Sequence, residues 1–176
     1  MALHEWHDFF IVAGTSAATL LGLLFVAVTL NADLILVGTR PQLKRVAEQA
    51  FQNYISVVLT ALLFLFPRQT WAVLATEQLV LGVAMSALVV YRIIVSARRV
   101  IDSDFSRLRT LKRLLPSLLG NLILVYSGWS SINAYDESSV QMFALATVIL
   151  VVAATAISWD LLLRVAEIRH RTQPPT

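Results

Sequence analysis

Polar side chains recur at helical spacing within the otherwise apolar segment 46–66. They are Glu48, Gln49, Gln52, Asn53, Ser56 and Thr60. Intervals of three and four residues place such side chains on one face of an α-helix, and we call this face the polar stripe. Lipid offers no hydrogen bonds, so the stripe must meet either another helix or water. Two alternatives follow: a dry interface of interhelical hydrogen bonds, or a hydrated pathway with Glu48 at its cytoplasmic mouth.

The first eight residues hold a second group of side chains with chemical potential. His4 and His7 are three residues apart, and His4 and Asp8 are four apart, so one turn of helix could present all three to a divalent metal. The spacing differs from the HExxH pattern and excludes a zinc protease of that type. Two other roles stay open for these histidines. They could anchor the chain at the membrane interface, or titrate near neutral pH and make this face sensitive to acid.

The sequence offers no set of residues for catalysis. It contains no cysteine, which excludes disulfides, thiolate chemistry and cysteine-bound metals. The apolar segments contain no histidine that could bind haem between them. Neither a glycine-rich phosphate loop nor a nucleophile paired with a base is recognisable. We therefore expect a protein that is not an enzyme and has no cofactor other than the metal considered above.

These residues must be positioned by membrane helices, because apolar residues make up 57% of the 176 residues and the mean hydropathy is +0.72. A helix of about 20 apolar residues crosses a hydrocarbon core of about 30 Å. The fold predicted for residues 1–176 is an all-α transmembrane bundle that forms a single domain. Its five predicted spans cover residues 9–30, 46–66, 71–95, 116–135 and 140–163.

The distribution of lysine and arginine predicts the orientation of the bundle. With five spans, alternate sides of the membrane hold 12 and 1 of these residues, and Arg92 lies near the end of the third span on the richer side. Because cytoplasmic loops retain lysine and arginine, the N-terminus should lie outside and the C-terminus in the cytoplasm. Asp160 and Arg164 near the end of the fifth span have the spacing of an intrahelical ion pair.

A basic amphipathic helix is expected over residues 103–115, lying on the membrane surface between spans three and four. We expect the basic residues around it to bind the headgroups of anionic lipids. They are Arg98, Arg99, Arg107, Arg109, Lys112 and Arg113. Nucleic acid is a poor alternative partner, because the segment has no DNA-binding motif and membrane threading already accounts for the charge.

Small residues indicate where helices pack closely. Gly14, Ala18 and Gly22 recur every fourth residue in the first span, so a neighbouring backbone can approach that face. The fourth span carries Gly120 and Gly128 together with several polar residues, which is typical of a packed interior helix or, alternatively, of a second pore wall. Association of the protein with itself through the first or fourth helix is expected to give a homo-oligomer.

Three stretches of sequence carry a resemblance to other proteins: HEWHDFF, GTSAATLLGLLFVAVTLN and RPQLKRVAEQAF, all within about the first 65 residues. They resemble a loosely defined group of small, uncharacterised bacterial integral membrane proteins. The resemblance implies a location in the bacterial inner membrane and brings no activity or site residues with it.

Two functions are compatible with these features. The first is an oligomeric pore or channel for small cations, lined by the polar stripe. The second is a non-catalytic accessory or scaffold protein that binds another membrane complex or anionic lipid, in which case the polar stripe is a dry interface.

Overall fold

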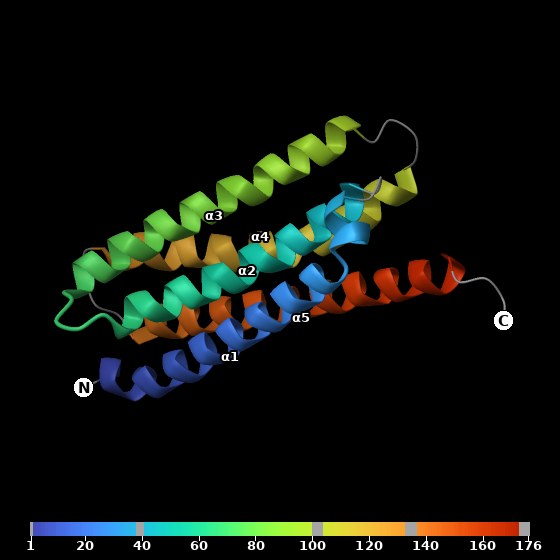
Figure 1. Ribbon diagram of the computed structural model, residues 1–176. Coiled ribbons are helices and arrows are strands. Elements are labelled where there is room, and N and C mark those ends of the chain that lie inside the picture. The colour runs from blue at the N-terminus through green and yellow to red at the C-terminus, as the bar shows by residue number, and fades with distance from the viewer. Residues whose placement is uncertain (1, 38–40, 100–103, 133–136, 173–176) are drawn as a thin grey trace.

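The structure, a computed structural model, is all-α, with no strand among the residues it describes, which are 2–37, 41–99, 104–132 and 137–172. Five long α-helices and one short π-helix form a bundle (Figure 1). Their bounds are α1 Ala2–Leu30, η1 Asp33–Val37, α2 Pro41–Leu65, α3 Trp71–Arg99, α4 Asp104–Ser131 and α5 Glu137–Thr172. Consecutive long helices run in opposite directions, and the ends of the chain lie at opposite ends of the bundle (Figure 1).

Helix boundaries follow the local sequence. The side chain of Asn31 donates to the carbonyl of Ala27 at 2.9 Å, and the carbonyl of Asn31 accepts from Leu34 and Ile35, which leads the chain from α1 into η1. Helix α2 begins at Pro41, where a missing N–H costs no intrahelical bond and the fixed φ suits a first helical residue. It ends at Leu65, two residues before Pro67, which cannot continue the helix.

Three helical segments are long and apolar enough to cross a membrane: Trp6–Leu30, Trp71–Val95 and Glu137–His170. They contain the first, third and fifth predicted spans, and they identify the chain as an α-helical membrane protein. Helices α2 and α4 are not among these segments. Both carry polar residues along their length, which lowers the hydropathy of any long window within them.

Helix α4 differs from the sequence prediction. A surface helix over 103–115 and a separate span from 116 were expected, with a boundary at Pro116, but α4 is one continuous helix with Pro116 inside it. Proline removes one backbone hydrogen bond and crowds the preceding turn. Leucine-rich turns on both sides of Pro116 favour the helix, and the turns beyond it pack against α3 and α5, which offsets this cost.

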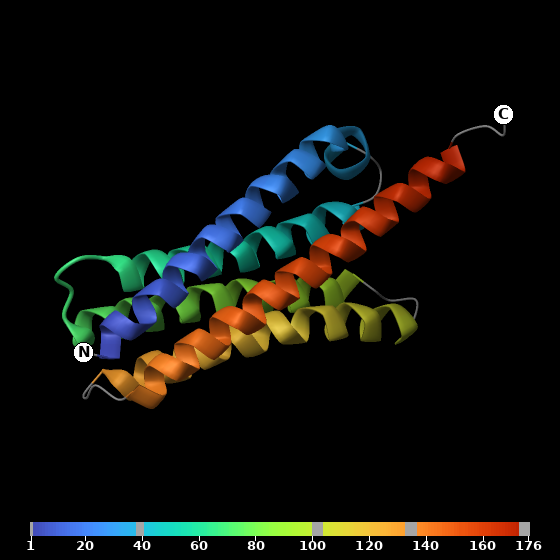
Figure 2. The ribbon, with the colours of Figure 1, turned by 90° about the horizontal axis from the view of Figure 1, so that it is seen from below.

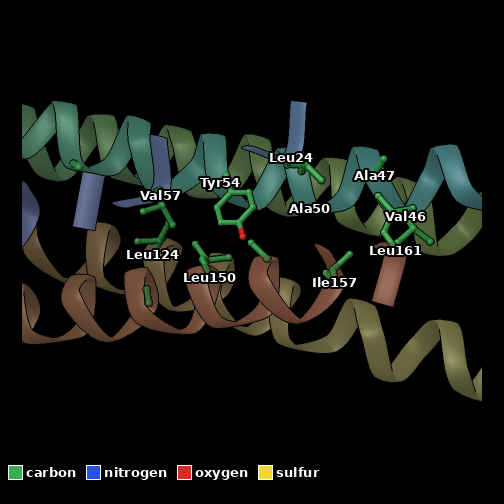
Figure 3. Close-up of a cluster of buried hydrophobic side chains, with 14 of the residues drawn as sticks. Leu24, Val46, Ala47, Ala50, Tyr54, Val57, Leu124, Leu150, Ile157 and Leu161 are labelled. Atoms are coloured by element: carbon green, nitrogen blue, oxygen red, sulfur yellow. The ribbon is translucent and has the colours of Figure 1, made fainter. Parts of the chain in front are cut away.

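The apolar core lies between α1, α2 and α5. Figure 3 shows Tyr54, Val57 and Leu150 within it, with the Tyr54 hydroxyl directed towards α5. That hydroxyl lies 3.2 Å from Oγ1 of Thr155. At the end of the bundle nearer the N-terminus, the rings of Phe10 and Phe64 stack with their centroids 3.9 Å apart. Burial of these side chains away from water and lipid contact fixes the three helices relative to one another.

Helices α3 and α4 are joined differently, through glycines that bring their backbones together. A Cβ atom on Gly128 would lie 2.8 Å from the backbone nitrogen of Leu79, and one on Gly82 would lie 2.9 Å from that of Val125. Gly120 of α4 similarly receives the side chain of Leu150 of α5. A neighbouring helix can come this close only where the residue has no side chain, as in glycine.

The small residues of α1 are used only in part. Gly14 faces Ala61 of α2, with 2.8 Å between the Ala61 Cβ and a Cβ built on Gly14. Ala18 and Gly22 lie on the exposed surface instead, and nothing is within 4 Å of a Cβ on Gly22. Within this chain the expected groove is therefore occupied only at Gly14, because α1 turns Ala17, the neighbour of Ala18, towards the core.

Candidate functional site

The polar stripe lies inside the bundle. The side chains of Gln49, Asn53, Ser56 and Thr60 are almost completely buried, with residue exposures of 0–1%, and Gln52 is 7% exposed. They face α3 and α4, on the side of α2 away from the apolar core. Glu48, the sixth residue of the stripe, differs from the others because nearly half of its side chain is exposed.

Side chains of α2 and α4 form a continuous hydrogen-bonded network. Asn53 Nδ2 donates to Ser117 Oγ at 2.7 Å, and Ser56 Oγ donates to Asn121 Oδ1 at 3.1 Å. Gln49 Nε2 donates to Asn53 Oδ1 at 3.3 Å, and Asn121 Nδ2 donates to the Ser117 carbonyl at 2.7 Å. Because these groups are removed from water, the bonds between them replace hydration that burial would otherwise remove.

Between α2 and α3, glutamine side chains bond to the backbone of the facing helix. Gln52 Nε2 donates to the carbonyl of Met85 at 3.1 Å, and Gln78 Nε2 donates to the carbonyl of Thr60 at 3.2 Å. The two contacts are about two helical turns apart along α3, so they tie the antiparallel pair together at two levels.

One ion pair spans the same two helices. Arg92 Nη2 lies 3.9 Å from Glu48 Oε2, which is beyond hydrogen-bonding distance. Arg92, near the end of the third predicted span, lies beside the first turns of α2, with about a quarter of its side chain exposed.

Several buried polar atoms of this region have no hydrogen-bond partner among the described residues. They are Gln49 Oε1, Gln52 Oε1, Thr60 Oγ1, Gln78 Oε1, Ser86 Oγ, Arg92 Nη1 and Ser127 Oγ. We call the whole region the polar interface: the polar stripe of α2, with Gln78, Ser86 and Arg92 of α3 and Ser117, Asn121 and Ser127 of α4. Leaving a buried polar group unpaired costs more free energy than a hydrogen bond contributes. Because several such atoms are unpaired here, the hydrogen-bonding groups of the polar interface are only partly satisfied.

Sequence reasoning did not assign Gln78, Ser86 or Arg92 to this region. A signal was present for Gln78 and Ser86, because they lie eight residues apart in an apolar helix and so fall near one face. Ser117 and Asn121, four residues apart, carry the same signal in α4. Nothing in the sequence indicated which helix each would meet.

The N-terminal candidates are described only in part. His7 Nδ1 lies 3.6 Å from Asp8 Oδ1, and both side chains are substantially exposed. The side chain of His4 lies outside the described residues, so the proposed set of three metal ligands cannot be assembled from the rest. Among the residues that the structure describes, no group of three histidine, aspartate or glutamate side chains is placed to hold a metal.

Of the basic residues near the start of α4, the structure describes the backbone but not the side chains. The backbones of Arg98 and Arg99 belong to the last turn of α3, and residues 107–113 belong to the first half of α4. Their side chains lie outside the described residues. The expected ion pair of α5 is confirmed: Arg164 Nε donates to Asp160 Oδ2 at 2.9 Å.

Comparison of the chain with protein-family models, with curated proteins and with solved structures gives no match.

Proposed function

We propose that all five long helices cross the membrane, with the N-terminus outside and the C-terminus in the cytoplasm. Helices α2 and α4 turn their polar residues towards the polar interface, while residues such as Leu62 and Leu119 are exposed on the bundle surface. A helix whose polar side chains are shielded by its neighbours can cross lipid although its mean hydropathy is low. The positive-inside rule supports the orientation.

We infer that the protein is a non-catalytic scaffold in the bacterial inner membrane that binds another membrane protein. The observation that carries this inference is the bond between Asn53 and Ser117, both fully buried. It supports a polar stripe that serves the protein's own packing and leaves the outer surface apolar. On that surface, the exposed small residues Ala18 and Gly22 offer a close approach to a partner helix.

A photo-crosslinking amino acid at position 22 tests this function in native membranes. We expect it to capture a membrane protein at a fixed ratio, and we expect Gly22→Leu to abolish copurification of that protein. A crosslinker at Leu62 of α2, which is also exposed, is the matched control and should not capture the same protein. If the two positions give the same products, or products that include only lipid, the scaffold function is wrong.

A pore for small cations is the second candidate, and one observation favours it. The unpaired oxygens of Gln49, Gln52, Thr60 and Gln78 are neutral ligands of the kind that line cation pathways, and Glu48 lies at one end of them. Such a path would run within one bundle and not at the centre of an oligomer. Cation flux through liposomes containing the purified protein, altered by Asn53→Leu, would support the pore. A flux no different from that of empty liposomes would eliminate it.

We also propose that the basic residues around the start of α4 bind anionic lipid headgroups at the cytoplasmic surface. Their placement next to a bundle end, at the junction of α3 and α4, supports this arrangement. Replacing Arg107, Arg109 and Lys112 with glutamine should reduce the anionic lipid that copurifies with the protein.

A further inference from the structure

The helices fall into two groups according to how they are held together. The buried apolar core is built from α1, α2 and α5, and α4 adds only Leu124 to its fully buried members. From α3, Trp71 at the first turn packs against its edge, and no other described residue of that helix does so. Helix α3 is attached to α4 through Gly82 and Gly128, with backbone against backbone. We call α1, α2 and α5 the core group and α3 with α4 the hairpin.

The two groups meet in two places: α4 packs against α5, and α2 faces the hairpin through the polar interface. The contacts there are the bonds of Asn53 and Ser56 to α4, those of Gln52 and Gln78 between α2 and α3, and the long ion pair of Glu48. Eight buried side-chain atoms of the described residues lack a hydrogen-bond partner, and five of them belong to residues of the polar stripe or to residues of α3 that contact α2: Gln49, Gln52, Thr60, Gln78 and Arg92. The incomplete pairing is thus concentrated where the hairpin meets α2.

The chemistry of these contacts permits displacement. A carboxamide that donates to a backbone carbonyl can find another carbonyl on the next turn, because the acceptors repeat along the helix. The unpaired oxygens and hydroxyls gain partners when water reaches them. The glycine contacts within the hairpin and the side-chain packing of the core group have no such substitutes, because both depend on close fit of one surface to another.

We propose that the hairpin moves as one body against the core group, parting from α2 along the polar interface and admitting water to it. The packing of α4 against α5, which includes the contact of Gly120 with Leu150, stays in place during this motion and serves as its pivot. The structure is the closed state, and the open state is a minor population with a hydrated interface. The motion is independent of the scaffold function and of conduction, since a hydrated interface need not extend through the membrane.

The absence of cysteine makes the proposal testable with introduced thiols. Thr60→Cys places a reporter in the polar interface, and Val57→Cys places a matched control one turn away on the core side of α2; both positions are fully buried. The probe is the membrane-impermeant cation 2-(trimethylammonium)ethyl methanethiosulfonate, applied to the full chain in lipid nanodiscs. We expect it to modify Thr60→Cys faster than Val57→Cys by about tenfold or more.

A disulfide across the polar interface distinguishes an interface that opens and closes from one that is permanently hydrated. The pair Asn53→Cys and Ser117→Cys, whose native side chains touch, should join α2 to α4 when oxidised. Oxidation should then lower the rate at Thr60→Cys by about tenfold, and reduction should restore it. The pair Ser56→Cys and Asn121→Cys is a second staple at a neighbouring level, used if the first variant does not elute as a folded protein.

Three results would overturn the proposal. The first is equal modification of Thr60→Cys and Val57→Cys. The second is a rate at Thr60→Cys that neither oxidised staple changes, which would indicate a permanently hydrated interface. The third is modification of Val57→Cys that falls together with Thr60→Cys on stapling, which would indicate loosening of the whole bundle. Loss of partner capture at position 22 would leave this proposal intact, since that experiment concerns the outer surface of α1.

Discussion

Asn53 of α2 donates a hydrogen bond of 2.7 Å to Oγ of Ser117 of α4, and both residues are fully buried. The two residues are 64 positions apart in the chain, yet they lie at the centre of the network that joins the core group to the hairpin. Asn53 also accepts from Gln49 through its Oδ1 atom. Its carboxamide is therefore used on both sides, as donor and as acceptor.

Asn53→Leu should destabilise the bundle. The substitution leaves Ser117 Oγ and Gln49 Nε2 without their partners in a buried environment, at a cost of about 1–3 kcal/mol. Unfolding of the purified protein by increasing sodium dodecyl sulfate in mixed micelles measures this cost. A double-mutant cycle with Ser117→Ala should show a coupling of about 0.6–2 kcal/mol between the two side chains. Additive effects would mean that the bond contributes nothing.

Gly128→Leu should disrupt the hairpin, whereas Gly22→Leu should not affect folding. A side chain at position 128 would collide with the backbone of Leu79, and overpacking of this kind costs about 1–3 kcal/mol or more. Position 22 is open on the bundle surface. The same unfolding assay compares the two variants. Equal stability of Gly128→Leu and the parent protein would contradict the backbone contact between α3 and α4.

Removal of the ion pair should have a small effect. Arg92 and Glu48 are separated by 3.9 Å and both are partly exposed, so screening limits their attraction to about 0–1 kcal/mol. Glu48→Gln is therefore expected to unfold at nearly the same fraction of sodium dodecyl sulfate as the parent protein. That fraction should be well above the one at which Asn53→Leu unfolds. An effect of Glu48→Gln as large as that of Asn53→Leu would show that the charge pair contributes as much to the stability of the bundle as the hydrogen bonds of Asn53 do.

The orientation can be tested with single cysteines at the two ends of the chain. We expect His4→Cys to react with an impermeant maleimide in intact spheroplasts and His170→Cys to react only after the membrane is opened. The physical reason is that lysine and arginine resist translocation, and the residues before α2 contain only Arg40 of that type. Reaction of both cysteines from the same side would require an even number of crossings.

The amino-acid sequence by itself determined the class of protein and most of the helices. Uncharged runs such as 9–30 have one low-energy form in lipid, because the backbone must satisfy its own hydrogen bonds there, and three of the five predicted spans lie within helices able to cross a membrane. Spacing alone also placed the polar residues of α2 on one face. These are local properties, set by the helical repeat and by the hydrophobicity of neighbouring residues.

Tertiary structure decided which surfaces meet. The sequence could not show that Asn53 would bond to Ser117, that Gln78 would reach the carbonyl of Thr60, or that Gly22 would be left exposed while Gly14 contacts α2. Nor could it show that α4 would run on through Pro116. In each case several local arrangements have similar energies, and the contacts between helices distant in the chain select one of them by close packing and hydrogen bonding.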